Sequence, residues 1–147
     1  MKRITYMALA LCLVLGVSTG DARNTIHQLP IADALAVGEE KSVLTGEISF
    51  YFGDAAHPAV EKSIGTFTAN RKTNAVGKSD EEACNWAFMS AMKSLEERAM
   101  KEGGDAVINI YSYYYKNKVV SETEFECGAG GVMAGVTMIG EVVKLAE

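Results

Sequence analysis

The alternation of hydrophobic and polar positions predicts strands on both sides of one helix. Five segments show a two-residue period or a high content of β-branched and aromatic residues: 48–52, 64–69, 106–115, 119–127 and 132–145. We expect the last of these to be bulged at Gly135 or Gly140. Between the strands, residues 70–78 form a polar connection and residues 128–131 a flexible, glycine-rich one.

A helix is predicted over residues 79–102. Ser79 and Glu82 have the spacing of a capping box, in which the hydroxyl accepts the third helical N–H. An apolar stripe follows at helical spacing, consisting of Cys84, Phe88, Ala91, Leu95 and Ala99. Met89 and Met92 are expected to fill the core, whereas the solvent face should hold Lys93, Glu96, Glu97 and Lys101.

This order of elements predicts an α+β fold for residues 23–147. The strands should form a mostly antiparallel sheet of about five strands, packed on the one main helix in the order β-β-α-β-β-β. Residues 23–36 show a mixed pattern to which no element is assigned.

The beginning of the chain has the organisation of a secretion signal. Lys2 and Arg3 precede a nearly continuous apolar run over residues 4–17, and small residues then allow cleavage after Gly20 or Ala22. The alternative is a membrane anchor, but the apolar run is shorter than the roughly 20 residues that span a bilayer. We therefore expect a periplasmic or secreted protein without a stable membrane anchor.

Export changes the interpretation of the cysteines. Cys12 lies within the apolar run after Leu11, where a lipid-attachment signal would need a small residue, and it leaves with the signal. The remaining pair, Cys84 and Cys127, is predicted to form a disulfide in an oxidising compartment. The alternative, a redox or metal-binding pair, is disfavoured because there is no Cys-x-x-Cys spacing and no histidine at a ligand-like distance in sequence.

The strand that ends at Cys127 also has two distinct faces. Phe125 and Cys127 share one face, whereas Glu122, Glu124 and Glu126 share the other, which we expect to be solvated. Because no histidine is near these acids in sequence and their strand face is expected to be solvated, acid–base catalysis is not indicated. No catalytic residue, metal ligand or cofactor is predicted.

Composition and charge narrow the function classes further. Hydrophobic residues make up 48% of the 147 residues, with only two prolines, which is typical of a folded chain. After removal of residues 1–20, 12 basic residues face 19 acidic ones, a net charge of −7. This balance argues against binding nucleic acid, which requires Lys and Arg to neutralise phosphates.

Two motifs are candidates for binding. Residues 72–79 match a phosphate-binding loop except that Lys72 replaces the first glycine, so Gly77, Lys78 and Ser79 could contact a nucleotide. A connection that ends at the N-cap Ser79 is the favoured interpretation. The second candidate is a row of Tyr111, Tyr113 and Tyr115 on one strand face, which could bind a partner or could pack against a neighbouring strand.

Several of these segments carry a resemblance to known families. They are Gly77-Lys78-Ser79-Asp80, Cys84, Trp86, Gly104-Asp105-Ala106-Val107, Ser112-Tyr113-Tyr114 and Thr123-Glu124-Phe125-Glu126-Cys127. Over about half of the chain, they resemble small exported bacterial proteins of unknown function that are often automatically named "excinuclease ATPase subunit". More remotely, the helix followed by Gly-Gly-Asp-Ala-Val is similar to the YbjQ-like family and the Rcs stress-sensor lipoprotein. These similarities imply an α+β fold, a disulfide-linked sheet in the lipoprotein and a ring-shaped oligomer in the YbjQ-like family, although the chain lacks a lipid-attachment cysteine.

The resulting expectation is a non-catalytic binding or envelope-stress module. Its partner would be a protein or a cell-wall component. The alternatives are a nucleotide-binding ATPase that uses Gly77, Lys78 and Ser79, and a structural homo-oligomer.

Overall fold

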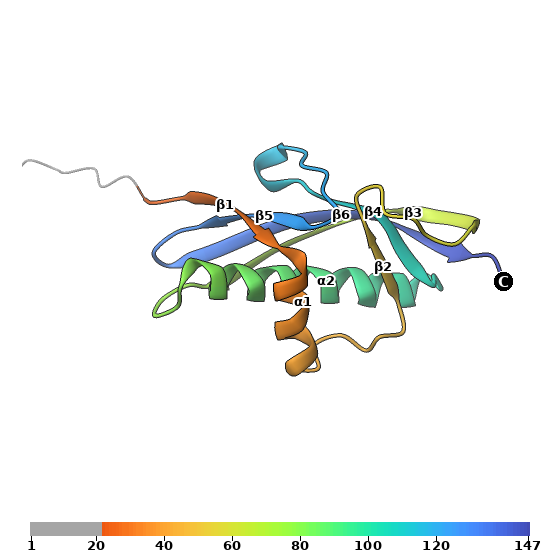
Figure 1. The fold of residues 1–147 in the computed structure, drawn as a ribbon, viewed down its shortest axis with the longest axis horizontal. Coiled ribbons are helices and arrows are strands. Elements are labelled where there is room, and N and C mark those ends of the chain that lie inside the picture. The colour runs from red at the N-terminus through yellow and green to blue at the C-terminus, as the bar shows by residue number, and fades with distance from the viewer. Residues whose placement is uncertain (1–21) are drawn as a thin grey trace, which may run out of the picture.

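One long strand, β6 (Met133–Leu145), runs through the centre of the sheet and pairs with three others. The computed structural model describes residues 22–147, so the predicted signal peptide and Cys12 lie outside the described residues. β3 (Val60–Asn74) pairs antiparallel with one edge of β6 over its whole length. The opposite edge pairs first with β5 (Glu124–Ala129) and then with β4 (Ala106–Ser112), also antiparallel (Figure 1).

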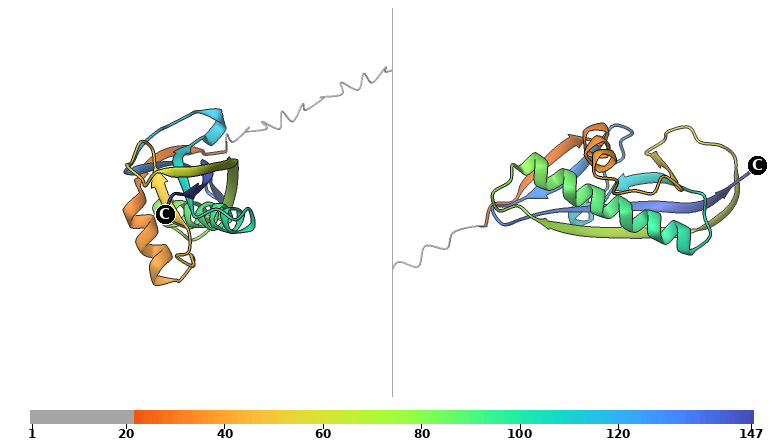
Figure 2. Two further views of the ribbon diagram at one scale, coloured as in Figure 1. Left: turned by 90° about the vertical axis from the view of Figure 1, so that its right-hand side faces the viewer. Right: turned by 90° about the horizontal axis from the view of Figure 1, so that it is seen from below.

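The sheet is completed by two outer strands, and two α-helices pack on it. β1 (Thr25–Pro30) pairs antiparallel with β5, and β2 (Ser49–Phe52) pairs parallel with β4. The long helix α2 (Asp80–Lys101) lies along one face of the sheet, and the short α1 (Ile31–Glu40) packs across α2 (Figures 1 and 2). The α+β class and the main helix are therefore confirmed, whereas the sheet has six strands and is mixed.

The predicted order of elements was wrong at the N-terminus. The mixed segment 23–36 contains β1 and most of α1. β1 is a short edge strand in which His27 and Leu29 are half-buried and Ile26 is exposed, so its hydrophobic residues do not alternate as in a strand with one buried face. The predicted connection over residues 70–78 was also partly wrong, because β3 continues to Asn74 with polar side chains on its solvent-facing side.

Helix α2 supplies nine of the 28 buried hydrophobic residues. Ser79 Oγ accepts a hydrogen bond from the N–H of Glu82 at 3.1 Å, which confirms the predicted N-cap. Phe88 stacks on Phe125 of β5 with ring centroids 4.3 Å apart. The predicted disulfide is confirmed: Cys84 and Cys127 are bonded and both are completely buried.

Two acidic residues predicted to face solvent are buried. Glu96 is 1% exposed, and its carboxylate accepts hydrogen bonds from the backbone N–H groups of Thr45 and Gly46. Glu126 is 5% exposed and accepts a hydrogen bond from Gln28 Nε2 at 2.8 Å. In both cases a neighbouring segment covers the carboxylate and supplies donors, which the periodicity of the element itself does not reveal.

The bulge predicted within residues 132–145 lies instead in the strands that pair with β6. The register between β4 and β6 shifts between Ile108 and Tyr111, opposite Gly140, and Asn109 there has φ 51°. β3 carries two further irregularities near its start. The predicted strands 106–115 and 119–127 are also shorter, since β4 ends at Ser112 and β5 begins at Glu124.

The first described residues are fastened to the start of α2. The two terminal guanidinium nitrogens of Arg23, Nη1 and Nη2, donate to the Asp80 carboxylate at 2.7 and 2.9 Å, and His27 Nε2 lies 2.9 Å from the same group. These contacts, the Arg23 hydrogen bonds first, hold the pKa of Asp80 well below its usual range. Among residues 22–147, no helix is both long and apolar enough to cross a membrane.

Candidate functional site

A pair of glycines on neighbouring strands creates a flat area on the sheet face opposite α2. Gly128 of β5 and Gly135 of β6 are direct partners in the antiparallel ladder. The ring of Tyr114, in the 3-10 helix η1 (Tyr114–Lys116), lies over both. A Cβ atom at Gly128 would overlap the Tyr114 hydroxyl, and one at Gly135 would contact the ring at 3.6 Å. Glycine is therefore needed at Gly128 for the tyrosine to lie against the sheet.

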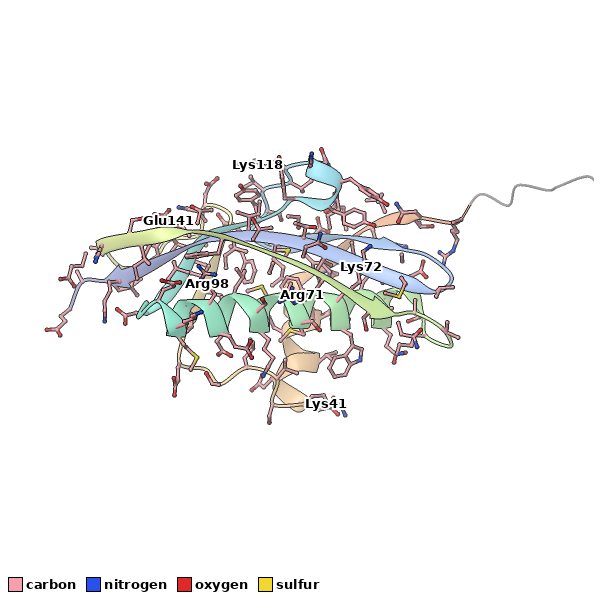
Figure 3. The ribbon with its side chains drawn as sticks, turned by 180° about the vertical axis from the view of Figure 1, so that it is seen from behind. Lys41, Arg71, Lys72, Arg98, Lys118 and Glu141 are labelled. Atoms are coloured by element: carbon pink, nitrogen blue, oxygen red, sulfur yellow. A yellow bond between two sulfur atoms is a disulfide. The ribbon has the colours of Figure 1, made fainter. Side chains whose placement is uncertain are left out.

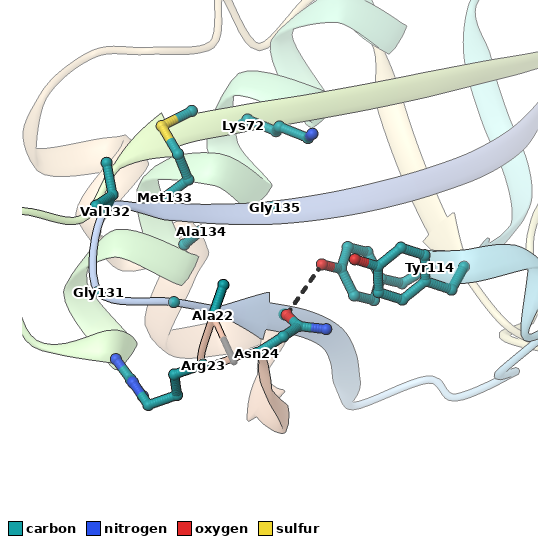
Figure 4. A pocket seen from close by; sticks show the side chains of 13 residues that line it. Ala22, Arg23, Asn24, Lys72, Tyr114, Gly131, Val132, Met133, Ala134 and Gly135 are labelled. Carbon is teal, nitrogen blue, oxygen red and sulfur yellow. Dashed lines mark hydrogen bonds between the residues drawn. The ribbon is translucent and has the colours of Figure 1, made fainter. Parts of the chain in front are cut away.

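A hollow opens beside this tyrosine, with a volume of about 560 Å³ (Figure 4). Its floor is formed by glycines of β5, β6 and their connecting turn, and its walls by Tyr114, Tyr115, Lys72 and Asn24. A second hollow of about 390 Å³ shares Lys72 and both tyrosines and adds Asn70 and Lys116. We call these two hollows, which share three lining residues, the outer groove. Their volumes are in the range of small-ligand sites.

Tyr115 is held in an unusual backbone conformation at the rim of the outer groove. Its φ and ψ are 47° and 35°, and Lys116 follows with φ 62°, so two consecutive non-glycine residues are left-handed. The Tyr115 side chain is 76% exposed and contacts Tyr114, with ring centroids 4.5 Å apart. Such backbone strain is concentrated at functional sites in proteins.

This geometry divides the predicted tyrosine row. Tyr111 and Tyr113 contact each other edge to face, with centroids 6.2 Å apart, and Lys118 Nζ lies 4.5 Å from the centre of the Tyr111 ring. Tyr115 belongs to the other pair, with Tyr114. Because β4 ends at Ser112, the strand alternation does not continue to Tyr115, and the three residues do not form one row.

The outer groove is locally basic although the chain as a whole is acidic. Lys72 and Lys116 are exposed and form no ion pair within residues 22–147. Lys72 and Arg71 are consecutive residues of β3, so their side chains lie on opposite faces of the sheet. The Arg71 guanidinium donates to the Ser94 hydroxyl of α2, on the face away from the outer groove (Figure 3). Glu126, the acid nearest in the β5 sequence, is buried against Gln28.

The tyrosine beside these lysines stays neutral at physiological pH. Burial raises the pKa of Tyr114 to about 12, and the neighbouring Tyr115 adds to the rise. The protonated hydroxyl donates to Asn24 Oδ1 at 3.3 Å, which leaves the amide N–H₂ of Asn24 available to a ligand (Figure 4).

The loop that resembles a phosphate-binding motif is a tight turn between β3 and α2. Gly77 has φ 74°, and Lys78 Nζ donates back to the Asn74 carbonyl oxygen at 3.1 Å. Asp80, Glu81 and Glu82 occupy the first turn of α2, where a phosphate would bind. The negative charge of these three side chains opposes a bound phosphate.

The remaining polar candidates lie apart from one another. His27 contacts Asp80, His57 packs edge-on against Tyr51 at 5.7 Å, and Glu122 and Glu124 are exposed. Within the described part of the chain, no group of three His, Cys, Asp or Glu side chains could hold a metal ion.

The contribution of the glycine pair can be tested by substitution. We expect Gly128→Ala to lower the free energy of unfolding by about 1–3 kcal/mol, because the new methyl group must displace Tyr114. Gly131→Ala is the matched control: nothing lies within 4 Å of its Cβ position, so the change should stay within about 0.5 kcal/mol. Urea unfolding measures both. Equal stability of the two variants would contradict the packing of Tyr114 on Gly128.

The sequence indicated only part of this site. Tyr115 was predicted to lie on a strand face that it does not occupy. Lys72 was noted only as the residue that replaces a glycine in the phosphate-binding motif, and it lies in β3. Asn24, Tyr114 and the glycine pair were missed, although two glycines in register next to a tyrosine run are a usable signal. Comparisons of the chain with protein-family models, with curated proteins and with solved structures found no match.

Proposed function

We propose that this protein is a non-catalytic binding module that acts in the periplasm or outside the cell, with its ligand in the outer groove. The observation that carries the proposal is the exposed Tyr115 ring, held in a left-handed conformation in the same hollow as Lys72, which forms no ion pair with the described residues. An exposed aromatic ring on a strained backbone supplies contact area with little loss of side-chain freedom on binding. The buried disulfide supports an oxidising compartment.

The partner class is a protein or a cell-wall component, and the role is envelope interaction or stress sensing. No cofactor is required, because recognition uses a ring face, two amines and side-chain amides. The oligomeric alternative is favoured by one feature: among the described strands, the 15-residue β3 pairs only with β6, so its other edge is open. Light scattering on the processed chain distinguishes a monomer from such an oligomer.

Capture from an envelope extract tests the binding proposal. The full chain is expressed with its own N-terminus, and the purified product is immobilised as wild type, Tyr115→Ala, Lys72→Ala or Lys41→Ala. Lys41 is an exposed lysine at the end of α1 and serves as the matched control. We expect the Lys41 variant to capture the same components as wild type, and the two groove variants to lose them. Identical capture by all four proteins would refute the proposal.

A further inference from the structure

We propose that the outer groove binds a carboxylated saccharide, with a sugar ring on Tyr115 and the carboxylate between Lys72 and Lys116. This inference rests on the proposed binding function and specifies its ligand class. The four side chains that carry it come from three separate parts of the chain: Asn24, Lys72 and the consecutive pair Tyr115 and Lys116.

The backbone of the groove floor favours a saccharide over an extended peptide. Peptides that bind to sheets add a strand to an open edge and are held by main-chain hydrogen bonds. At the floor, β6 is paired on both sides, with Gly135 opposite Gly128 on one strand and opposite Lys72 on the other. No open edge of β6 is available there, so a ligand must be recognised by side chains and by the flat surface.

The Tyr115 ring provides the apolar contact. Its exposed fraction is 76%, and Tyr114 supports it from behind with ring centroids 4.5 Å apart. A pyranose ring has one face of C–H groups, which stack on an aromatic ring, and a rim of hydroxyls that need polar partners. Asn24 and Asn70 lie along the walls and have side-chain amides for that rim.

The charges select an anionic ligand, and a carboxylate in particular. Lys72 and Lys116 are two single amines with no acidic partner in the described chain, while the one nearby guanidinium, Arg23, is bound to Asp80. Proteins usually hold phosphate groups with clusters of backbone N–H groups, helix N-termini or arginine forks. Two lysine amines match the two oxygen atoms of a carboxylate, since each amine can donate one charge-assisted hydrogen bond to one oxygen.

Two disaccharides that differ mainly in the carboxylate test this assignment. The probes are N-acetylglucosaminyl-N-acetylmuramic acid, which carries a lactyl carboxylate, and N,N′-diacetylchitobiose (here chitobiose), which has no charge. Isothermal titration of the processed wild-type protein should give a Kd of roughly 0.1–1 mM for the acidic sugar and a value about tenfold weaker for chitobiose. Equal binding of the two sugars, or no binding of either at 10 mM, about ten times the upper expected Kd, would overturn the inference.

Substitutions separate the contribution of the Tyr115 ring to binding from that of the lysine charge. Lys72→Ala should weaken the acidic sugar by about fivefold and leave chitobiose unchanged, because it removes one exposed charge contact. Tyr115→Ala should weaken both sugars, Tyr115→Phe should retain both, and Lys41→Ala should behave as wild type. Thermal unfolding checks that each variant is folded. A loss of acidic-sugar binding in the Lys41 variant equal to that in the Lys72 variant would contradict the site.

A pentaglutamate peptide distinguishes failure of this inference from failure of the proposed function. If the peptide binds in a Tyr115-dependent manner and the sugars do not, the saccharide assignment is wrong and the groove remains a binding site. If envelope capture is also unaffected by the groove variants, the binding function itself is refuted.

Discussion

Replacing Cys84 and Cys127 together by alanine is expected to lower the free energy of unfolding by about 3–4 kcal/mol. The two cysteines are 43 residues apart in sequence, so the cross-link removes a large share of the conformational freedom of the unfolded chain. The bond also has a specific place in the fold. β5 pairs with β6 through only two residue pairs, and Cys127 ties β5, with β1 beside it, to the main helix.

Urea unfolding of the processed chain measures this effect, and reduced wild-type protein is the control. The reduced protein keeps both sulfur atoms, so its loss of stability reports the cross-link alone. Hydrogen exchange should show the largest loss of protection in β1 and β5, since these strands depend most on the bond. Equal unfolding midpoints for oxidised, reduced and double-alanine proteins would show that the bond contributes no stability.

Glu96→Ala should destabilise the protein by about 3–4 kcal/mol, although glutamate on a helix is usually replaceable. The carboxylate accepts hydrogen bonds from the Thr45 N–H at 2.9 Å, the Thr45 hydroxyl at 2.8 Å and the Gly46 N–H at 3.2 Å. Removing it leaves a gap where a buried side chain packed, and the donors of the exposed loop residues Thr45 and Gly46 lose the acceptor that holds this loop against α2.

The adjacent acid provides a matched control for this prediction. Glu97 side-chain atoms are 66% exposed, and its only ion pair with residues 22–147 is a 3.9 Å contact with Lys93 one turn earlier. Glu97→Ala should therefore change the free energy of unfolding by less than about 0.5 kcal/mol. Glu96→Gln should fall between the two alanine variants, because one amide oxygen can still accept. Similar unfolding midpoints for Glu96→Ala and Glu97→Ala would contradict the assigned role of Glu96.

The helix and the disulfide could be predicted because their signals are strong and simple. Ser79 caps α2, and the apolar stripe through Cys84 and Phe88 fixes the face that meets the sheet. Alternation along the last strands placed Cys127 on the same core. The predicted helix, residues 79–102, differs from α2 by one residue at each end.

The errors arise where contacts between distant segments decide the structure. Pro30 directly precedes α1 in a junction without a connecting loop, so neither the strand nor the helix has a typical boundary. The burial of Glu96 depends on the loop at Thr45, 51 positions away. The left-handed conformation of Tyr115 is rare for its residue type, so no local rule would predict it.

The position of β6 has a consequence for how the chain is made. β6 follows every other described strand in sequence, and β3 has no other partner in the sheet. While a ribosome is still adding residues before Met133, β4 can pair only with β2 and β5 only with β1. The six-stranded sheet can therefore assemble only after β6 has been synthesised, so the nascent polypeptide lacks its central strand during most of the synthesis of residues 22–145.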